Sequence, residues 1–146
     1  MPGKASLRAQ QYYAHPQNLF WDFMAQFFEF DREAPYSKRI SALQQNRVAL
    51  WDVLKSCTRT SSLDSDIISS SIVINPFGKF FQVHPAITAV CFNGAKADAL
   101  YRRHVLPDLE CVQTLSYHRL PSTSPANASI PRSSKLREWR SALSAV

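Results

Sequence analysis

A segment rich in aromatic side chains, Gln10 to Trp21, constrains the fold of this chain more than any other stretch. Its sequence is QQYYAHPQNLFW, and it contains no acidic residue. Pro16 disfavours the α conformation at His15, so the first half of the segment is expected to be extended or looped. Apolar residues then recur at helical spacing, at positions 20, 21, 23, 24, 27 and 28, which predicts an amphipathic helix that begins near Asn18. Asparagine is a favoured N-cap, and Asp22 in the first turn suits the positive end of the helix dipole.

Two interpretations of this segment stay open on the residues alone. An aromatic loop that ends at a helix N-terminus can hold a flat, polar ligand. An aromatic segment that enters an apolar helix is more often part of a hydrophobic core, with Asn18 acting only as a cap, because a pocket also requires convergent polar groups. Composition and spacing by themselves favour the core interpretation.

Length and composition set the broad class of the protein. A chain of 146 residues with 45% hydrophobic residues is expected to form one domain, residues 1–146, with a real core. No apolar run approaches the ~20 residues that span a bilayer, so we expect no membrane partner. The three cysteines lack metal-ligand spacing. They predict reduced thiols in an intracellular protein with no metal site and no cofactor.

The charge distribution favours a polyanionic partner. The formal net charge is +6, a balance that is common in proteins that bind nucleic acid. Four basic residues, Arg132, Lys135, Arg137 and Arg140, lie in the last fifteen positions, with only Glu138 opposing them. The same cluster is also compatible with an ordinary solvated helix face.

Helical and strand patterns alternate along the chain. The predicted elements are a helix at Tyr36 to Gln45, a buried strand at Val48 to Leu54 with Trp51 in the core, a loop at Cys57 to Ser71 with a helical turn at Leu63 to Ile68, a short strand at Ile72 to Ile74, a helix at Phe77 to Val83, a strand at Ile87 to Phe92, a helix at Ala95 to His104, a strand at Val112 to Leu120, a loop at Pro121 to Pro131 and a helix at Ser134 to Leu143. This alternation predicts an α/β domain with a parallel sheet.

Several segments together resemble the hypoxanthine-DNA (deoxyinosine) glycosylases, a branch of the uracil-DNA glycosylase superfamily. They are QYYAHPQNLFW, ALWDVLKSCTRTSSLDSDI (Ala49 to Ile67), FNGAKA (Phe92 to Ala97), LPSTSPANA (Leu120 to Ala128) and KLREW (Lys135 to Trp139). The resemblance covers nearly the whole chain and implies a three-layer α/β fold with a short parallel sheet flanked by helices. Met1-Pro2-Gly3 resembles the end of an element that follows a buried strand in this family, so the resemblance also implies that this N-terminal strand is missing here.

The resemblance implies roles for the aromatic segment. Asn18 falls at the position of the family's catalytic asparagine, where an amide would hold a water and hydrogen-bond the extruded base. Gln11 would read the edge of a purine, and Tyr12, Tyr13 and Phe20 would form the stacking wall of the base pocket. His15 is expected either to be a neutral hydrogen-bond partner or merely to pack beside Pro16.

A second set of residues would hold the DNA backbone. In the superfamily, small hydroxyl residues and free backbone amides after a strand grip the phosphates that flank the extruded nucleotide, and Ser122, Thr123 and Ser124 occupy that place. Lys135, Arg137 and Arg140 are expected to contact phosphate rather than base.

The implied activity is that of a monofunctional DNA glycosylase, a monomer that removes a deaminated base, preferably hypoxanthine, from DNA. The rival interpretations are the same chemistry on uracil or on mismatched uracil, and a catalytically silent DNA-binding relative or fragment.

Overall fold

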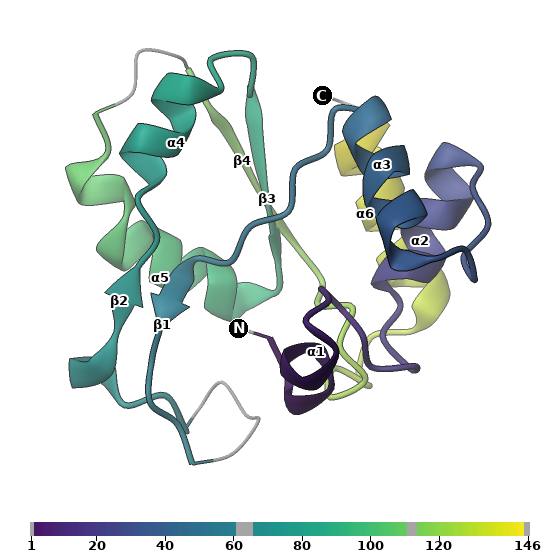
Figure 1. Ribbon diagram of the computed structural model, residues 1–146, viewed down its shortest axis with the longest axis horizontal. Coiled ribbons are helices and arrows are strands. Elements are labelled where there is room, and N and C mark those ends of the chain that lie inside the picture. Colours follow the sequence, from purple (N-terminus) through teal and green to yellow (C-terminus); the bar gives the residue numbers. More distant parts are fainter. Residues whose placement is uncertain (1, 61–65, 111–113, 145–146) are drawn as a thin grey trace.

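The computed structural model describes residues 2–60, 66–110 and 114–144 (Figure 1). Along the chain the elements are α1 (Lys4–Ala9), α2 (Phe20–Phe28), α3 (Tyr36–Gln45), β1 (Leu54–Ser56), the 3-10 turn η2 (Ser69–Ser71), β2 (Val73–Ile74), α4 (Phe77–Val83), β3 (Ala89–Asn93), α5 (Ala95–His104), the 3-10 turn η3 (Leu106–Asp108), β4 (Ser116–Leu120) and α6 (Arg132–Ser144).

A short parallel sheet, formed by β3 and β4, lies at the centre of the molecule. The two strands pair in register from Ala89 opposite Ser116 to Asn93 opposite Leu120. β1 and β2 form a separate antiparallel pair. Figure 1 shows α4 and α5 on one side of the central pair and α2, α3 and α6 on the other. The fold is therefore the α/β arrangement with a short parallel sheet flanked by helices that the sequence predicts.

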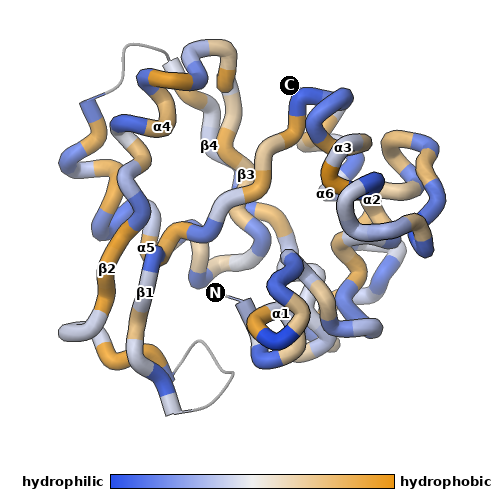
Figure 2. The backbone as a smooth tube through the Cα atoms, viewed as in Figure 1, coloured by the Kyte–Doolittle hydropathy of each residue, from blue (hydrophilic) through white to orange (hydrophobic). Residues whose placement is uncertain are grey.

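Side-chain alternation along β3 explains why helices cover both faces. Cys91 packs against the cluster formed by α2 and α6, whereas its neighbours Val90 and Phe92 pack against α4 and α5. Successive residues of a strand point to opposite faces, so a strand that is apolar at consecutive positions has to be buried on both. Figure 2 shows this apolar character along β3.

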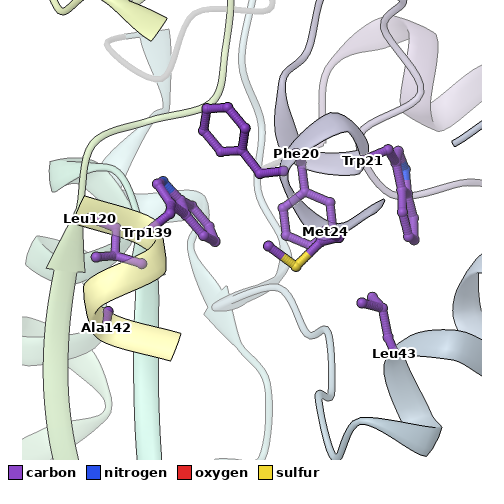
Figure 3. Close-up of a cluster of buried hydrophobic side chains, with 8 residues drawn as sticks. Phe20, Trp21, Met24, Leu43, Leu120, Trp139 and Ala142 are labelled. Atoms are coloured by element: carbon purple, nitrogen blue, oxygen red, sulfur yellow. The ribbon is translucent and has the colours of Figure 1, made fainter. Parts of the chain in front are cut away.

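The larger core joins α2, α3 and α6 to the sheet. It contains Phe20, Trp21, Phe23, Met24, Leu43, Leu120, Trp139 and Ala142 (Figure 3). The ring of Phe20 meets the ring of Trp139 edge to face, with centroids 5.9 Å apart. This contact ties the aromatic helix α2 to the C-terminal helix α6, which places the two functional loops that precede these helices on a common support.

Most predicted elements are confirmed. The helices α3, α4 and α5 have the predicted bounds, and β2, β3, β4 and α6 lie within a few residues of their predicted positions. The helical turn predicted at Leu63 to Ile68 and the start of the strand predicted at Val112 fall wholly or partly outside the described residues. The predicted Ser134 start of the last helix is two residues late, since α6 begins at Arg132.

The buried strand predicted at Val48 to Leu54 is wrong. Only Leu54 of that run lies in a strand, because β1 begins there. The carbonyl of Asp52 accepts a hydrogen bond from the Asn75 side chain at 2.7 Å, and the amide of Val48 bonds to Leu43 at the end of α3. These backbone groups therefore have hydrogen-bond partners without pairing to a neighbouring strand. Trp51 is 36% exposed rather than buried in the core, and it covers the rings of α4.

The helix α1 is not predicted by the sequence pattern. It is six residues long, its N-terminus has no side-chain cap, and it ends at Gln10 in the left-handed conformation. Packing holds it in place: the Ser6 side chain is buried and accepts a hydrogen bond from the amide of Ala14 at 3.1 Å. The helix therefore forms part of the support of the aromatic loop.

Candidate active site at the ends of β3 and β4

The candidate site lies where the parallel strands end. Asn93 is the last residue of β3 and Gly94 follows it, and the loop 121–131 follows β4. The loop 10–19, which connects α1 to α2, joins them there, because the amide of Leu19 donates to the carbonyl of Thr123 at 3.1 Å. The carboxyl ends of parallel strands are the usual place for a ligand in α/β folds.

The side chain of Asn18 is held by the start of α2. Its Oδ1 accepts a hydrogen bond from the amide of Phe20 at 3.0 Å, and the backbone amide of Asn18 donates to the carbonyl of His15 at 2.9 Å. The helix itself begins at Phe20, two residues after the predicted cap. Among the described residues, Nδ2 of Asn18 has no hydrogen-bond partner. The side chain is therefore fixed through its oxygen, while both hydrogens of its amide remain available to a ligand.

Tyr13 and Phe20 do not form an open stacking wall, so that prediction is corrected. Their rings stack on each other with centroids 4.0 Å apart. Phe20 is only 2% exposed. The phenol of Tyr13 bonds to the side chain of Asn93, and burial raises the pKa of Tyr13 to about 12. Both rings are therefore core contacts of the loop, and neither offers a free face to a base.

Tyr12 fixes the loop to two other parts of the fold. Its amide donates to the hydroxyl of Tyr36 at 3.1 Å, and its carbonyl accepts from the indole of Trp21 at 2.9 Å. The ring is half-buried next to Asp52; burial first, and the nearby Asp52 carboxylate second, raise the pKa of Tyr12. Burial also raises the pKa of Asp52, and the charge of Arg59 opposes this shift.

The two remaining predicted pocket residues are still accessible. Gln11 is half-buried, and its amide donates to the carbonyl of Ser6 at 3.1 Å. His15 is exposed, and its Nδ1 accepts a hydrogen bond from the amide of Gln17 at 3.2 Å. This bond uses Nδ1 as an acceptor, so Nε2 is the ring nitrogen that can donate to a ligand.

The loop after β4 is held from inside the protein. Asn93 bonds to both the amide and the hydroxyl of Thr123, each at 2.8 Å, and Trp139 donates to the carbonyl of Pro121 at 2.9 Å. Thr123 is 0% exposed. The expectation that Thr123 contacts phosphate is therefore corrected, because its hydroxyl faces inward and serves the structure of the loop.

Ser122 and Ser124 remain suited to an anion, although the backbone amides beside them do not. The amide of Ser124 donates to the Ser122 hydroxyl at 3.2 Å, and the amide of Ala126 donates to the Ser124 hydroxyl at 3.3 Å. These amides are therefore not free to grip a phosphate. A serine hydroxyl that accepts an amide hydrogen still carries its own proton to donate. Both side chains are half-buried, so these two hydroxyls are the donors that the loop presents.

Lys135 is placed differently from the prediction. It is 3% exposed, and its Nζ donates to the carbonyl of Asn127 at 2.6 Å. Burial lowers the pKa of Lys135. No carboxylate pairs with it within the described part of the chain. Lys135 therefore supports the loop 121–131 from behind, and the direct phosphate contact predicted for it is incompatible with this position.

The arginines of α6 lie on the surface. Arg137 is exposed and donates to the Ser134 hydroxyl at 3.3 Å. Arg140 lies over the ring of Phe27 at 5.6 Å and lines a hollow of about 300 Å³ between α2 and α6. Arg132 is committed to Asp22, with a shortest contact of 2.6 Å. Arg137 and Arg140 are thus the α6 cations that stay available to an anionic partner.

A second basic surface borders α1. It contains a hollow of about 430 Å³, which is lined by Lys4, Leu7, Cys57, Thr58, Arg59 and Thr60. The guanidinium of Arg59 donates to the carbonyl of Pro2, which joins this hollow to the start of α1. The sequence patterns did not indicate Lys4, Asn93, Gly94 or Asn127 as site residues. The Asn-Gly pair at 93–94, a common turn sequence, is the signal that could have indicated two of these four.

Other classes of site find no support in the described residues. No three His, Cys, Asp or Glu side chains among them gather closely enough to hold a metal. None of the helices within these residues has the length and apolarity of a membrane span. Cys57 and Cys91 are free thiols, and burial raises the pKa of Cys91.

Curated relatives are similar over part of the chain. A hypoxanthine DNA glycosylase of Methanosarcina acetivorans is 38% identical over 98 residues, which is 66% of this chain and 61% of that protein. The corresponding protein of Methanosarcina barkeri is 36% identical over the same shares. The matched part thus spans about three-fifths of the length of these curated relatives. No protein-family model matches the chain.

A solved structure is similar over almost the whole chain. It is the solution NMR structure of a candidate uracil DNA glycosylase from Methanosarcina acetivorans, with a TM-score of 0.78 and 31% sequence identity. The similarity covers 97% of this chain and 83% of that one. Sequence and fold agree over most of both chains, and we conclude that this chain belongs to the uracil-DNA glycosylase superfamily.

Proposed function

We propose that this protein is a monofunctional DNA glycosylase that hydrolyses the N-glycosidic bond of a deaminated base, preferably hypoxanthine. The observation that carries the proposal is the geometry of Asn18. Its oxygen is fixed by the start of α2, its amide hydrogens are free among the described residues, and it lies one residue from Leu19, which bonds to the loop of Ser122 and Ser124. The curated relatives are named for the same activity.

The arrangement suits hydrolysis of an extruded nucleotide. An enzyme of this kind takes its target base out of the stack, at a cost of a few kcal/mol that is lowest for a damaged or mispaired base. Ser122 and Ser124 would donate to the flanking phosphates, while the amide of Asn18 would orient a water toward C1′ of the sugar. Correct orientation removes much of the entropic part of the barrier.

The proposed roles require no covalent step between enzyme and sugar. An amide cannot take a proton, so Asn18 would act by positioning and by stabilising the departing base through hydrogen bonds. Lys135, the lysine beneath the loop, is buried and bonded to Asn127. It is therefore not available as a Schiff-base nucleophile, which supports simple hydrolysis.

The test is base release from duplexes that carry one deoxyinosine or one deoxyuridine. We expect release of free hypoxanthine, with the strand cut only after alkali treatment, because a monofunctional enzyme leaves an abasic site. Release of uracil alone would show that the preferred substrate is deoxyuridine and not deoxyinosine. Binding of both duplexes without release would contradict the enzymatic proposal and support a silent DNA-binding relative.

Neutralising the exposed arginines of α6 is expected to weaken DNA binding without changing base preference. The logarithm of the DNA-binding constant falls linearly with the logarithm of the salt concentration. Arg137→Gln and Arg140→Gln should each reduce the steepness of this fall by about one unit if each side chain contacts one phosphate. The measurement is a titration of binding against salt on matched and inosine-containing duplexes.

Lys79→Gln provides the matched control for these arginines. Lys79 is an exposed cation on α4, on the other side of the sheet, and its replacement should leave the slope unchanged. An altered base preference with an unchanged slope in the arginine variants would show that they do not contact phosphate.

A further inference from the structure

Asn93, the last residue of β3, joins three separate segments of the chain through its side chain. Oδ1 accepts from the amide of Thr123, and Nδ2 donates to the hydroxyl of Thr123, both at 2.8 Å. The side chain also bonds to the phenol of Tyr13. A primary amide offers two hydrogens and one oxygen, which is enough for all three bonds.

These bonds hold both ends of the segment that carries Asn18. Asn93 touches Tyr13 directly at one end. At the other end the carbonyl of Thr123 accepts the amide hydrogen of Leu19 at 3.1 Å, and Leu19 is covalently attached to Asn18. The same Thr123 sits between Ser122 and Ser124. One side chain therefore relates the Asn18 segment to the two serine hydroxyls.

The backbone of Tyr13 shows that this end of the segment is held under constraint. Its φ is 54°, in the left-handed region, which a bulky aromatic residue adopts only where its surroundings enforce it. The stack on Phe20 and the bond to Asn93 hold its ring, and the amides of Tyr12 and Ala14 on either side are hydrogen-bonded as well. Removing the Asn93 bonds loosens Tyr13 and Thr123 together.

We propose that Asn93 is a positioning residue, which sets the place of the Asn18 amide relative to Ser122 and Ser124. This inference rests on the proposed function, because it assigns to Asn93 the alignment of the water-holding amide with a sugar that is held through its phosphates. Asn93 itself touches neither base nor phosphate in this role. Its effect should therefore appear in the rate of base release and not in DNA affinity.

The expected loss follows from the sensitivity of hydrolysis to geometry. A displacement of about 1 Å at a reacting group costs up to about 100-fold in rate. Asn93→Ala should lower single-turnover base release about 10- to 100-fold while the dissociation constant for the same duplex changes less than about threefold. Tyr13→Phe removes only the phenol and keeps the stack on Phe20, so it should lower release by a smaller factor with no change in affinity.

Asn93→Asp provides the conservative rescue. Its carboxylate can accept from the amide of Thr123, from the hydroxyl of Thr123 after rotation, and from the hydroxyl of Tyr13. All three connections are retained, and most of the release rate lost in Asn93→Ala should return. Asn46→Ala is the control for loss of an asparagine amide elsewhere, because within the described residues the side chain of Asn46 bonds to the end of α3 alone, at the carbonyl of Ala42.

The experiment measures single-turnover release from a deoxyinosine duplex, equilibrium binding to that duplex and the melting temperature of each variant. A folded Asn93→Ala with a wild-type release rate would overturn the positioning role, as would equal losses in Asn93→Ala and Asn93→Asp. If Asn93→Ala does not fold, Tyr13→Phe decides: an unchanged rate overturns the role, and a lower rate with unchanged affinity supports it. If the wild type releases no base from any duplex, the proposed function fails first, and the role of Asn93 falls with it.

Discussion

Replacement of Asn18 by alanine should lower the release of hypoxanthine at least about 100-fold, the loss typical for removal of one preorganised donor from an active site. The fold and the affinity for DNA should remain close to wild type, because the contact proposed for Asn18 is to the reacting groups and not to the DNA backbone. The reason lies in the geometry of the side chain, whose oxygen is fixed by the amide of Phe20 at 3.0 Å while its nitrogen is free among the described residues. Single-turnover release and equilibrium binding on one deoxyinosine duplex give both quantities.

The alanine variant also loses the hydrogen bond from the amide of Phe20 at the start of α2, so a control has to separate the two effects. Loss of such a bond costs about 1 kcal/mol of stability. Asn18→Ser restores an oxygen that can accept from the amide of Phe20, but its shorter side chain carries one hydroxyl hydrogen in place of the two hydrogens of the amide. We expect the serine variant to melt close to wild type and to release hypoxanthine far more slowly than wild type, because the hydroxyl does not reach the position of the amide nitrogen. Near wild-type release in Asn18→Ala would refute the role of this residue, and full recovery in Asn18→Ser would show that the amide donor is not required.

The elements bounded by clear local signals could be predicted from the sequence. Pro35, Pro76 and Gly94 each lie directly before a helix whose first residue is predicted correctly. Proline restricts the backbone and glycine permits conformations that other residues avoid. Both effects are local, so no knowledge of the rest of the fold is required. β3 was likewise predictable, because a short β-branched and aromatic run that ends in Asn-Gly indicates a strand and a turn.

The strand predicted at Val48 to Leu54 failed because its pattern has no such local determinant. An apolar run of this length fits a buried strand, yet it becomes one only if a partner strand offers backbone groups along its length. Here the Asn75 side chain bonds to the carbonyl of Asp52 instead. That contact joins residues far apart in the sequence, and the composition of the run does not reveal it.

The candidate site shows the same division between local and tertiary information. Asn18 was predictable as a residue at a helix start, since its bond to Phe20 is local. The roles of Asn93 and Lys135 were not predictable, because they depend on bonds to Thr123 and Asn127 across loop and helix packing. A lysine in a basic cluster normally lies in solvent, and only the packing of α6 under the loop buries this one.

Replacement of Gly94 by alanine should destabilise the protein by about 1–3 kcal/mol and weaken its binding to DNA. The φ and ψ angles of Gly94 are 102° and 160°, a combination that is essentially restricted to glycine and costs other residues about that amount. A Cβ at this position would lie 3.0 Å from the Cβ of Ser122. Ser122 therefore has to shift, and with it one of the two hydroxyls proposed to bind phosphate.

The backbone around Gly94 offers no inexpensive alternative. Its amide donates to the carbonyl of Leu120 at 3.0 Å, which continues the pairing of β3 with β4 beyond Asn93. Relaxing the angles at Gly94 would break this bond and separate the two loops of the site. A cost of 1–3 kcal/mol corresponds to a fall of roughly 3–10 °C in Tm for a chain of this size.

Gly78→Ala is the matched control, because Gly78 lies within α4 and an added Cβ there meets nothing within 4 Å. That variant should be stabilised by about 0.5–1 kcal/mol through its helix propensity. A Gly94→Ala protein that melts and binds DNA like the wild type would show that the close approach of the two loops is not needed. A lower Tm with weaker binding, seen in Gly94→Ala and not in Gly78→Ala, would establish that the absence of a side chain at Gly94 sets the spacing between β3 and the Ser122 loop.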